Sequence, residues 1–177
     1  MRIVVLAGGL STEREVSISS GTLVAEALRS KGHEVVLLDV FMGYEENICD
    51  IDALFKQNYS FTDGNSIGDD VENTITNIKE AKENRLDKTS RYIGRNVIEI
   101  CAEADITFLA LHGGEGENGQ LQATLDLFGI KYTGSGYLGS ALAMNKGLTK
   151  SVFMQKNINT PRSEERRVGK ECRSRWS

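Results

Sequence analysis

Residues 3–9, IVVLAGG, form an unbroken run of β-branched and aliphatic side chains that ends at two glycines. Such a run is typical of a parallel strand that is buried on both faces. Apolar side chains then recur at helical spacing, at Val16, Leu23, Val24, Ala27 and Leu28. Gly32 suits the end of that helix, and residues 33–40, HEVVLLDV, predict a second strand. Strand, helix and strand in this order predict a βαβ unit, and therefore an α/β fold built on a parallel sheet.

The second half of the chain repeats these patterns around a third predicted strand, residues 105–111, DITFLAL. A helix is predicted before it by the spacing of Ile93, Val97, Ile100, Cys101 and Ala104. A helix that stops at Gly129 is predicted after it by Leu121, Thr124, Leu125 and Phe128. A last helix is predicted at Leu148, Val152 and Phe153. The predicted fold is a Rossmann-like parallel sheet flanked by helices.

Residues 41–92 carry the weakest pattern, and we predict no chemistry for them. Within them, residues 62–70, TDGNSIGDD, predict a loop, and residues 71–85 predict a polar, weakly helical segment. Farther along, residues 131–136, KYTGSG, predict a short strand followed by a turn.

The composition is that of a soluble globular protein, with 40% apolar and 26% charged residues. The apolar run at the start is too short for a signal peptide or a membrane span, which predicts a cytoplasmic location and no membrane partner. The three cysteines, Cys49, Cys101 and Cys172, form no CxxC pair, which argues against a disulfide framework or a thiolate metal site. We expect Cys49 and Cys101 to be reduced, partly buried thiols.

The last sixteen residues, 162–177, differ from the rest of the chain in composition. They hold six basic and three acidic residues, so residues 1–161 carry 15 basic and 22 acidic side chains, a net charge of −7. A basic run can indicate nucleic-acid binding or a solvated, disordered end. RSEERRVGKECRSRWS also resembles the translation of a common short-read sequencing adapter, and we expect a non-native, disordered tail, a gene that continues past Pro161, and no nucleic-acid partner.

The first glycine-rich stretch, AGGLSTEREVS, follows the first strand and carries candidate binding groups. It matches neither G-x-G-x-x-G nor a P-loop lysine motif, and its carboxylates would repel a phosphate. A carboxylate at the edge of a sheet suits an ammonium group instead. Thr12 and Glu15 have the spacing of a capping box, which is a structural role. The spacing therefore assigns Glu15 to structure and Glu13 to function.

Two more stretches carry candidate residues. His112 comes at the carboxyl end of the third strand, in HGGEGENG, where glycines allow backbone amides to approach a ligand closely. From the residues alone, a structural histidine is an equal alternative, and Asn118 is predicted to cap the next helix. In YTGSGYLGSALAMNKGLTK, Lys146 lies near a helix start, where most lysines are solvated surface charges.

Three motifs in this order, GGLSTEREVS, LALHGGEGENGQLQATLDLFGIKYTGSG and SALAMNK, resemble the N-terminal domain of the D-alanine–D-alanine ligases, which are ATP-grasp enzymes of peptidoglycan precursor synthesis. The resemblance implies that ATP phosphorylates the carboxylate of one D-alanine and that the amine of a second attacks the acyl phosphate. Glu13 is then the group that holds the first ammonium. His112 and Gly113 lie beside that substrate's carboxyl group, and Lys146 reaches the nucleotide.

The resemblance also implies ATP and Mg²⁺ as cofactors, with the metal ligands beyond Pro161, and a homodimer at full length. Residues 1–145 are expected to form the substrate-binding α/β domain, and residues 146–161 to begin the ATP-grasp central domain. The 177-residue chain alone is expected to be inactive. This sequence has Asn118 and Asn145 where the family usually shows GEDG and MDK.

Several other functions are alternatives to a D-alanine–D-alanine ligase. A D-alanine–D-serine ligase, a D-alanine–D-lactate ligase and a non-catalytic Rossmann-like binding module all stay open. A nicotinamide-dependent dehydrogenase is disfavoured, because Asp39 ends the second strand but G-x-G-x-x-G is missing. A response-regulator module is disfavoured because the third strand ends at Leu111 and His112 rather than at an aspartate.

Overall fold

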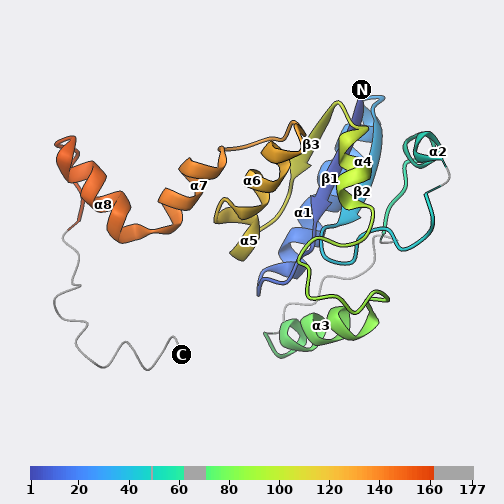
Figure 1. Cartoon of the computed structure of the whole chain (residues 1–177), viewed down its shortest axis with the longest axis horizontal. Helices are drawn as coiled ribbons and strands as arrows, with labels where there is room; N and C mark the ends of the chain where they lie inside the picture. Colours follow the sequence, from blue (N-terminus) through green and yellow to red (C-terminus); the bar gives the residue numbers. More distant parts are fainter. Residues whose placement is uncertain (49, 62–70, 162–177) are drawn as a thin grey trace. The chain divides into compact units, whose positions relative to one another are not determined.

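The computed structural model of the chain describes residues 1–48, 50–61 and 71–161 (Figure 1). It divides into two compact units, Met1–Met144 and Asn145–Ser177. The elements of the first unit are β1 (Arg2–Ala7), α1 (Arg14–Ser30), β2 (Glu34–Asp39), α2 (Ile51–Lys56), α3 (Val71–Asn84), α4 (Val97–Ala102), β3 (Ile106–Leu109), α5 (Gly114–Glu117), α6 (Gln120–Leu127) and α7 (Tyr137–Met144). The second unit contains α8 (Lys146–Gln155).

The three predicted strands form one parallel sheet in the order β2-β1-β3. Val5 of β1 pairs with Leu37 of β2 on one side and with Phe108 of β3 on the other. The α/β class and the parallel sheet are therefore as predicted, although β3 is shorter than residues 105–111. Since all three strands run the same way, their carboxyl ends meet at one edge of the sheet.

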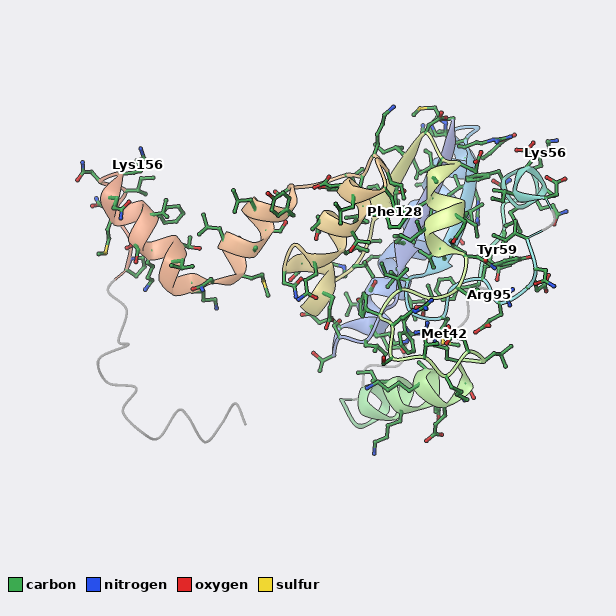
Figure 2. The ribbon with its side chains drawn as sticks, in the orientation of Figure 1. Met42, Lys56, Tyr59, Arg95, Phe128 and Lys156 are labelled. Carbon is green, nitrogen blue, oxygen red and sulfur yellow. The ribbon has the colours of Figure 1, made fainter. Side chains whose placement is uncertain are left out.

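The outer edges of the sheet are each covered by a short backbone pairing. On β2, Leu37 forms an isolated parallel bridge with Ser60, and on β3, Thr107 forms one with Tyr132. The predicted strand at residues 131–136 is therefore reduced to a single bridge. Tyr59 (Figure 2), beside the first bridge, packs edge to face against Tyr44, with ring centroids 5.1 Å apart.

The two faces of the sheet bury alternate residues of each strand, as the period of two requires. On one face, Val4, Leu6, Val36 and Leu38 pack with buried residues of α2, α4 and α6. On the other face, Ile3, Val5, Ala7, Val35 and Leu37 pack against α1. Figure 1 shows α1 and α4 on opposite sides of the strands, so the sheet is a layer between helices.

The buried face of α1 differs from the predicted one. Val16 and Leu23 are 55% and 64% exposed, and Ala27 is also exposed. The buried positions of α1 include Ser17, Gly21 and Ala25. A Cβ atom at Gly21 would lie 2.6 Å from the Cβ of Ala7, so a small residue is what allows the helix to approach β1 this closely. Val24 and Leu28 do pack against the core as predicted.

Other predicted helices are present with different ends. The helix predicted from Ile93 begins only at Val97, and Ala104 lies beyond its end. In α6, Leu121 and Leu125 are buried, but Phe128 is the residue after the helix and is 61% exposed. The segment predicted as weakly helical forms α3, and the last predicted helix forms α8.

Some features had no counterpart in the prediction, and some predictions lie outside the described residues. Helices α2 and α5 were not predicted, whereas α7 lies where a helix was expected between Gly136 and Lys146. Cys101 is a free, buried cysteine, and burial raises its pKa to about 12. The loop predicted for residues 62–70, the tail, Cys49 and Cys172 lie outside the described residues. None of the helices in the described part of the chain is long and apolar enough to cross a lipid bilayer.

Candidate functional site

The loop between β1 and α1 crosses the carboxyl edge of the sheet directly above Asp39, the last residue of β2. Gly8 has a φ of +74°, and a Cβ atom there would overlap the Asp39 carboxylate. Glycine is required on both counts, because other residues rarely adopt this φ and none would fit. The loop is thereby held close to the end of β2.

A buried ion pair between Arg14 and Asp39 contacts this loop near its start, at Gly9, and at its end, at Arg14. Arg14, 7% exposed, pairs with Asp39, which is fully buried, and also donates to the carbonyl of Gly9 at 2.7 Å. The same carboxylate accepts backbone N–H bonds from Gly9 at 3.3 Å, Phe41 at 2.8 Å and Met42 (Figure 2) at 3.2 Å. Asp39 is therefore committed to the fold, and it cannot serve as the ribose ligand that a dehydrogenase would need.

Ser11 connects this loop to the loop that follows β3. Its hydroxyl donates to the carbonyl of His112 at 2.5 Å and accepts the N–H of Glu13 at 3.1 Å. Gly113 has a φ of +69°, and a Cβ atom there would lie 3.1 Å from Oε2 of Glu13. The structure therefore brings together three of the residues singled out in the sequence: Glu13, His112 and Gly113.

These three residues are accessible from outside the fold. Glu13 is exposed, and His112 and Gly113 are half-buried. Glu13 makes no side-chain hydrogen bond to the helix that it precedes. An exposed carboxylate beside the backbone of His112 and Gly113 can bind a small molecule that carries both an ammonium and an anionic group.

Tyr92 is a residue of this region that the sequence did not indicate. Its hydroxyl lies against Gly9 and forms a backbone hydrogen bond with Leu10. Burial, reinforced by the nearby carboxylates of Glu115 and Asp39, raises the pKa of Tyr92 to about 12. The Tyr92 hydroxyl thus stays neutral at physiological pH and contacts the β1–α1 loop at Gly9 and Leu10. Ser11 and Arg14 were missed in the same way.

The start of α1 corrects the predicted capping box. The helix begins at Arg14 and its cap position is Glu13, so Thr12 lies one residue too early to be the N-cap. Glu15 lies in the first turn of α1, where a negative charge is favourable next to the helix dipole.

The two asparagines that depart from the family motifs both accept backbone hydrogen bonds at helix starts. Asn145 is the N-cap of α8 and accepts the N–H of Leu148 at 3.1 Å. Asn118 accepts the N–H of Gln120 at 3.0 Å, although the cap position of α6 is Gly119. Lys146, the first residue of α8, is exposed and belongs to the second unit.

A cavity of about 360 Å³ lies beside β3, separate from the three clustered residues. Its lining includes Leu111, Gly116, Gln122, Thr133 and Ser140, from β3 and the segments that follow it. The lining residues include the acidic Glu117 and no Lys, Arg or His. The described residues contain no group of three or more His, Cys, Asp or Glu side chains that could hold a metal ion.

Residues 2–135 match the family model described as the N-terminus of D-ala D-ala ligase. The chain belongs to the D-alanine–D-alanine ligase family. All the residues clustered at the carboxyl edge of the sheet, from Gly8 to Gly113, lie inside this match. The ligase-like fold expected from the sequence is thereby confirmed.

Individual ligases support the same assignment. A D-alanine–D-alanine ligase of Pediococcus pentosaceus is 46% identical over 161 residues, which are 90% of this chain and 44% of that protein. The ligase of Lacticaseibacillus casei is 44% identical over 160 residues, or 90% of this chain and 43% of that protein. A crystal structure of the Bacillus anthracis ligase complexed with ATP matches with a TM-score of 0.57 and 26% identity, covering 92% of this chain and 37% of that one. The chain thus spans less than half the length of these ligases.

Proposed function

We propose that this chain is the N-terminal part of a D-alanine–D-alanine ligase, which joins two D-alanines and converts ATP to ADP and phosphate through an acyl phosphate, for peptidoglycan precursor synthesis. Membership of the ligase family supports the reaction class. The observation that carries the proposal is the position of Glu13, whose carboxylate lies against Gly113 at the edge where β1 and β3 end.

In this proposal, Glu13 binds the ammonium group of the first D-alanine. The carboxylate is exposed, and Glu13 forms no side-chain bond to the start of α1. A charge-assisted hydrogen bond of this kind contributes about 1.5–3 kcal/mol. Ammonium binding at Glu13 would orient the carboxyl group of the substrate toward His112.

His112 and Gly113 are the proposed neighbours of that carboxyl group. Gly113 allows the backbone to approach an anion, because residues with a side chain rarely adopt its φ of +69° and a Cβ atom would crowd Glu13. His112 supplies a side chain that can donate a hydrogen bond to a carboxylate or to its phosphorylated form.

Lys146 is the proposed contact to ATP, since it is an exposed cation at the start of α8. We further propose that residues 1–145 form the substrate-binding domain and that residues 146–161 begin the ATP-grasp central domain. The described residues lack a metal-binding cluster, so they do not fit Mg²⁺, whose proposed ligands lie beyond Pro161.

The test of the reaction is D-alanine-dependent release of ADP by the full-length gene product. We expect release with D-alanine as the second substrate, and its absence would contradict the proposal. Faster release with D-serine or D-lactate as the second substrate would identify one of the two alternative ligases. Binding of D-alanine without ADP release would instead indicate a non-catalytic binding module.

The role of Glu13 is tested against Glu15, a glutamate two residues away in the first turn of α1. Glu13→Gln should raise the KM for the first D-alanine roughly ten- to a hundredfold, because a bond of about 1.5–3 kcal/mol is lost. Glu15→Gln should keep near-normal kinetics, since Glu15 lies in the first turn of α1, where its charge adds a helix-dipole contribution of about 0.3–1 kcal/mol to the stability of the helix. The opposite pattern would reverse the assignment.

The family resemblance also supports a full-length homodimer in the cytoplasm. Light scattering of the full-length protein should give twice the mass of one chain. A monomeric mass would remove this part of the proposal and leave the reaction unaffected.

A further inference from the structure

Two serine hydroxyls join the β1–α1 loop to the end of β3 in the same way. The inner one, Ser17, is fully buried, accepts the N–H of Gly8 at 2.9 Å and donates to the carbonyl of Ala110 at 2.8 Å. This link lies within the core, two residues before His112. It fixes the first residue of the loop to the sheet.

The outer hydroxyl, that of Ser11, makes the corresponding bonds among the candidate site residues. It accepts the N–H of Glu13 at 3.1 Å and donates to the carbonyl of His112 at 2.5 Å. The carbonyl of His112 belongs to the peptide unit that leads into Gly113. One side chain thus connects the backbone of Glu13 to the backbone against which the Glu13 carboxylate lies.

We propose that Ser11 is a positioning residue, whose hydroxyl sets the distance between the Glu13 carboxylate and the His112–Gly113 backbone. The inference rests on the proposed function, because it concerns the residues assigned there to the first D-alanine. Glu13 is exposed and comes before the first turn of α1, so the helix does not hold its side chain. The Ser11 bridge is the described contact that joins its backbone to the opposite loop.

The bridge between the two loops requires a hydroxyl group at residue 11. Accepting one hydrogen bond while donating another requires a group with both functions, which serine and threonine have and alanine lacks. Because Ser11 is half-buried rather than buried, its removal leaves both backbone groups near water. Loss of the bridge should therefore affect the position of Glu13 more than the stability of the fold.

The experiment compares Ser11→Ala, Ser11→Thr and Ser17→Ala in the full-length gene product. Ser11→Ala should raise the KM for the first D-alanine about two- to tenfold, the range of a neutral hydrogen bond, with the KM for ATP and the Tm nearly unchanged. Ser11→Thr should restore most of the lost affinity. Ser17→Ala, the matched control, should lower the Tm and leave the KM for D-alanine close to that of the wild type.

A double-mutant cycle with Glu13→Gln tests whether Ser11 acts through Glu13. If it does, Ser11→Ala should have little further effect on the KM for D-alanine once Glu13 is replaced. Additive effects would overturn the inference, as would a Ser11→Ala variant with an unchanged KM. A wild-type protein with no D-alanine-dependent ADP release would overturn the proposed function and this inference together. An active wild type, with a Ser11→Ala variant whose KM for D-alanine is unchanged, would overturn this inference alone.

Discussion

Replacing Asp39 with alanine should strongly destabilise the chain. Asp39 is fully buried, pairs with Arg14 and accepts three backbone N–H bonds. Asp39→Ala leaves a buried guanidinium without its counter-charge, which costs about 3–5 kcal/mol. For a chain of this size, each kcal/mol corresponds to roughly 2–4 °C, so the Tm should fall by about 6–20 °C.

The two members of the ion pair should differ in how much stability is lost when each is replaced. Arg14→Met removes the cation but leaves the Asp39 carboxylate with its backbone N–H donors, so the loss of stability should be smaller than for Asp39→Ala. Asp39→Asn keeps a hydrogen-bond acceptor and removes the charge, and it should fall between these two variants. The double variant should lose less than the sum of the single losses, because the two groups interact directly.

The assay is thermal and urea unfolding of the 177-residue chain, followed by circular dichroism. Asp52→Asn is the control, since it removes an exposed ion pair with Arg2, in which the side chains are 57% and 31% exposed. Its Tm should stay within error of the wild type. The reasoning would be refuted if Asp39→Ala unfolded at the wild-type temperature, or if Arg14→Met were the more damaging change.

Three further predictions concern the core. Gly21→Ala should lower stability by about 1–3 kcal/mol in urea unfolding, because its Cβ would lie 2.6 Å from that of Ala7, and wild-type stability would show that α1 can shift outward. Leu125→Ala should cost about 2–5 kcal/mol, whereas Leu127→Ala, two residues on but 87% exposed, should stay within about 0.5 kcal/mol; equal losses would contradict the assigned face of α6. Burial raises the pKa of Cys101 from 9.0 to about 12, so this thiol contributes stability that is complete below pH 9 and is lost as the pH rises toward 12. A Cys101→Ala variant should lack this pH-dependent loss of stability in urea unfolding. Identical pH profiles for the variant and the wild type would contradict the prediction.

The sheet was predictable because each strand is a short, mainly apolar run with a clear boundary. IVVLA ends at Gly8, and the run at residues 35–40 follows a polar turn. The shared edge of the strands then followed from parallel pairing, which is why Glu13 and His112 could be expected near each other. Neither conclusion required a contact that depends on side-chain detail.

The residues that hold this edge together could not be predicted, since their partners are distant in sequence or are backbone atoms. Ser11 bonds to a carbonyl 101 residues away, and Tyr92 lies against Gly9 from a segment without apolar periodicity. The predicted buried face of α1 was partly wrong, because spacing rules place large apolar residues inward. Close packing against Ala7 instead selects Gly21 and its small neighbours.

The single-residue bridges on the outer strands also bear on self-association. An edge strand with free N–H and C=O groups is a template on which a second molecule can add a strand. Leu37 donates to Tyr59 at 2.8 Å and accepts from Phe61 at 3.2 Å, and Thr107 donates to Lys131 at 2.8 Å and accepts from Thr133 at 3.0 Å. The middle of each outer strand is thus already paired by a crossing segment, so an incoming strand would have to displace it, and this sheet is protected against edge-to-edge aggregation.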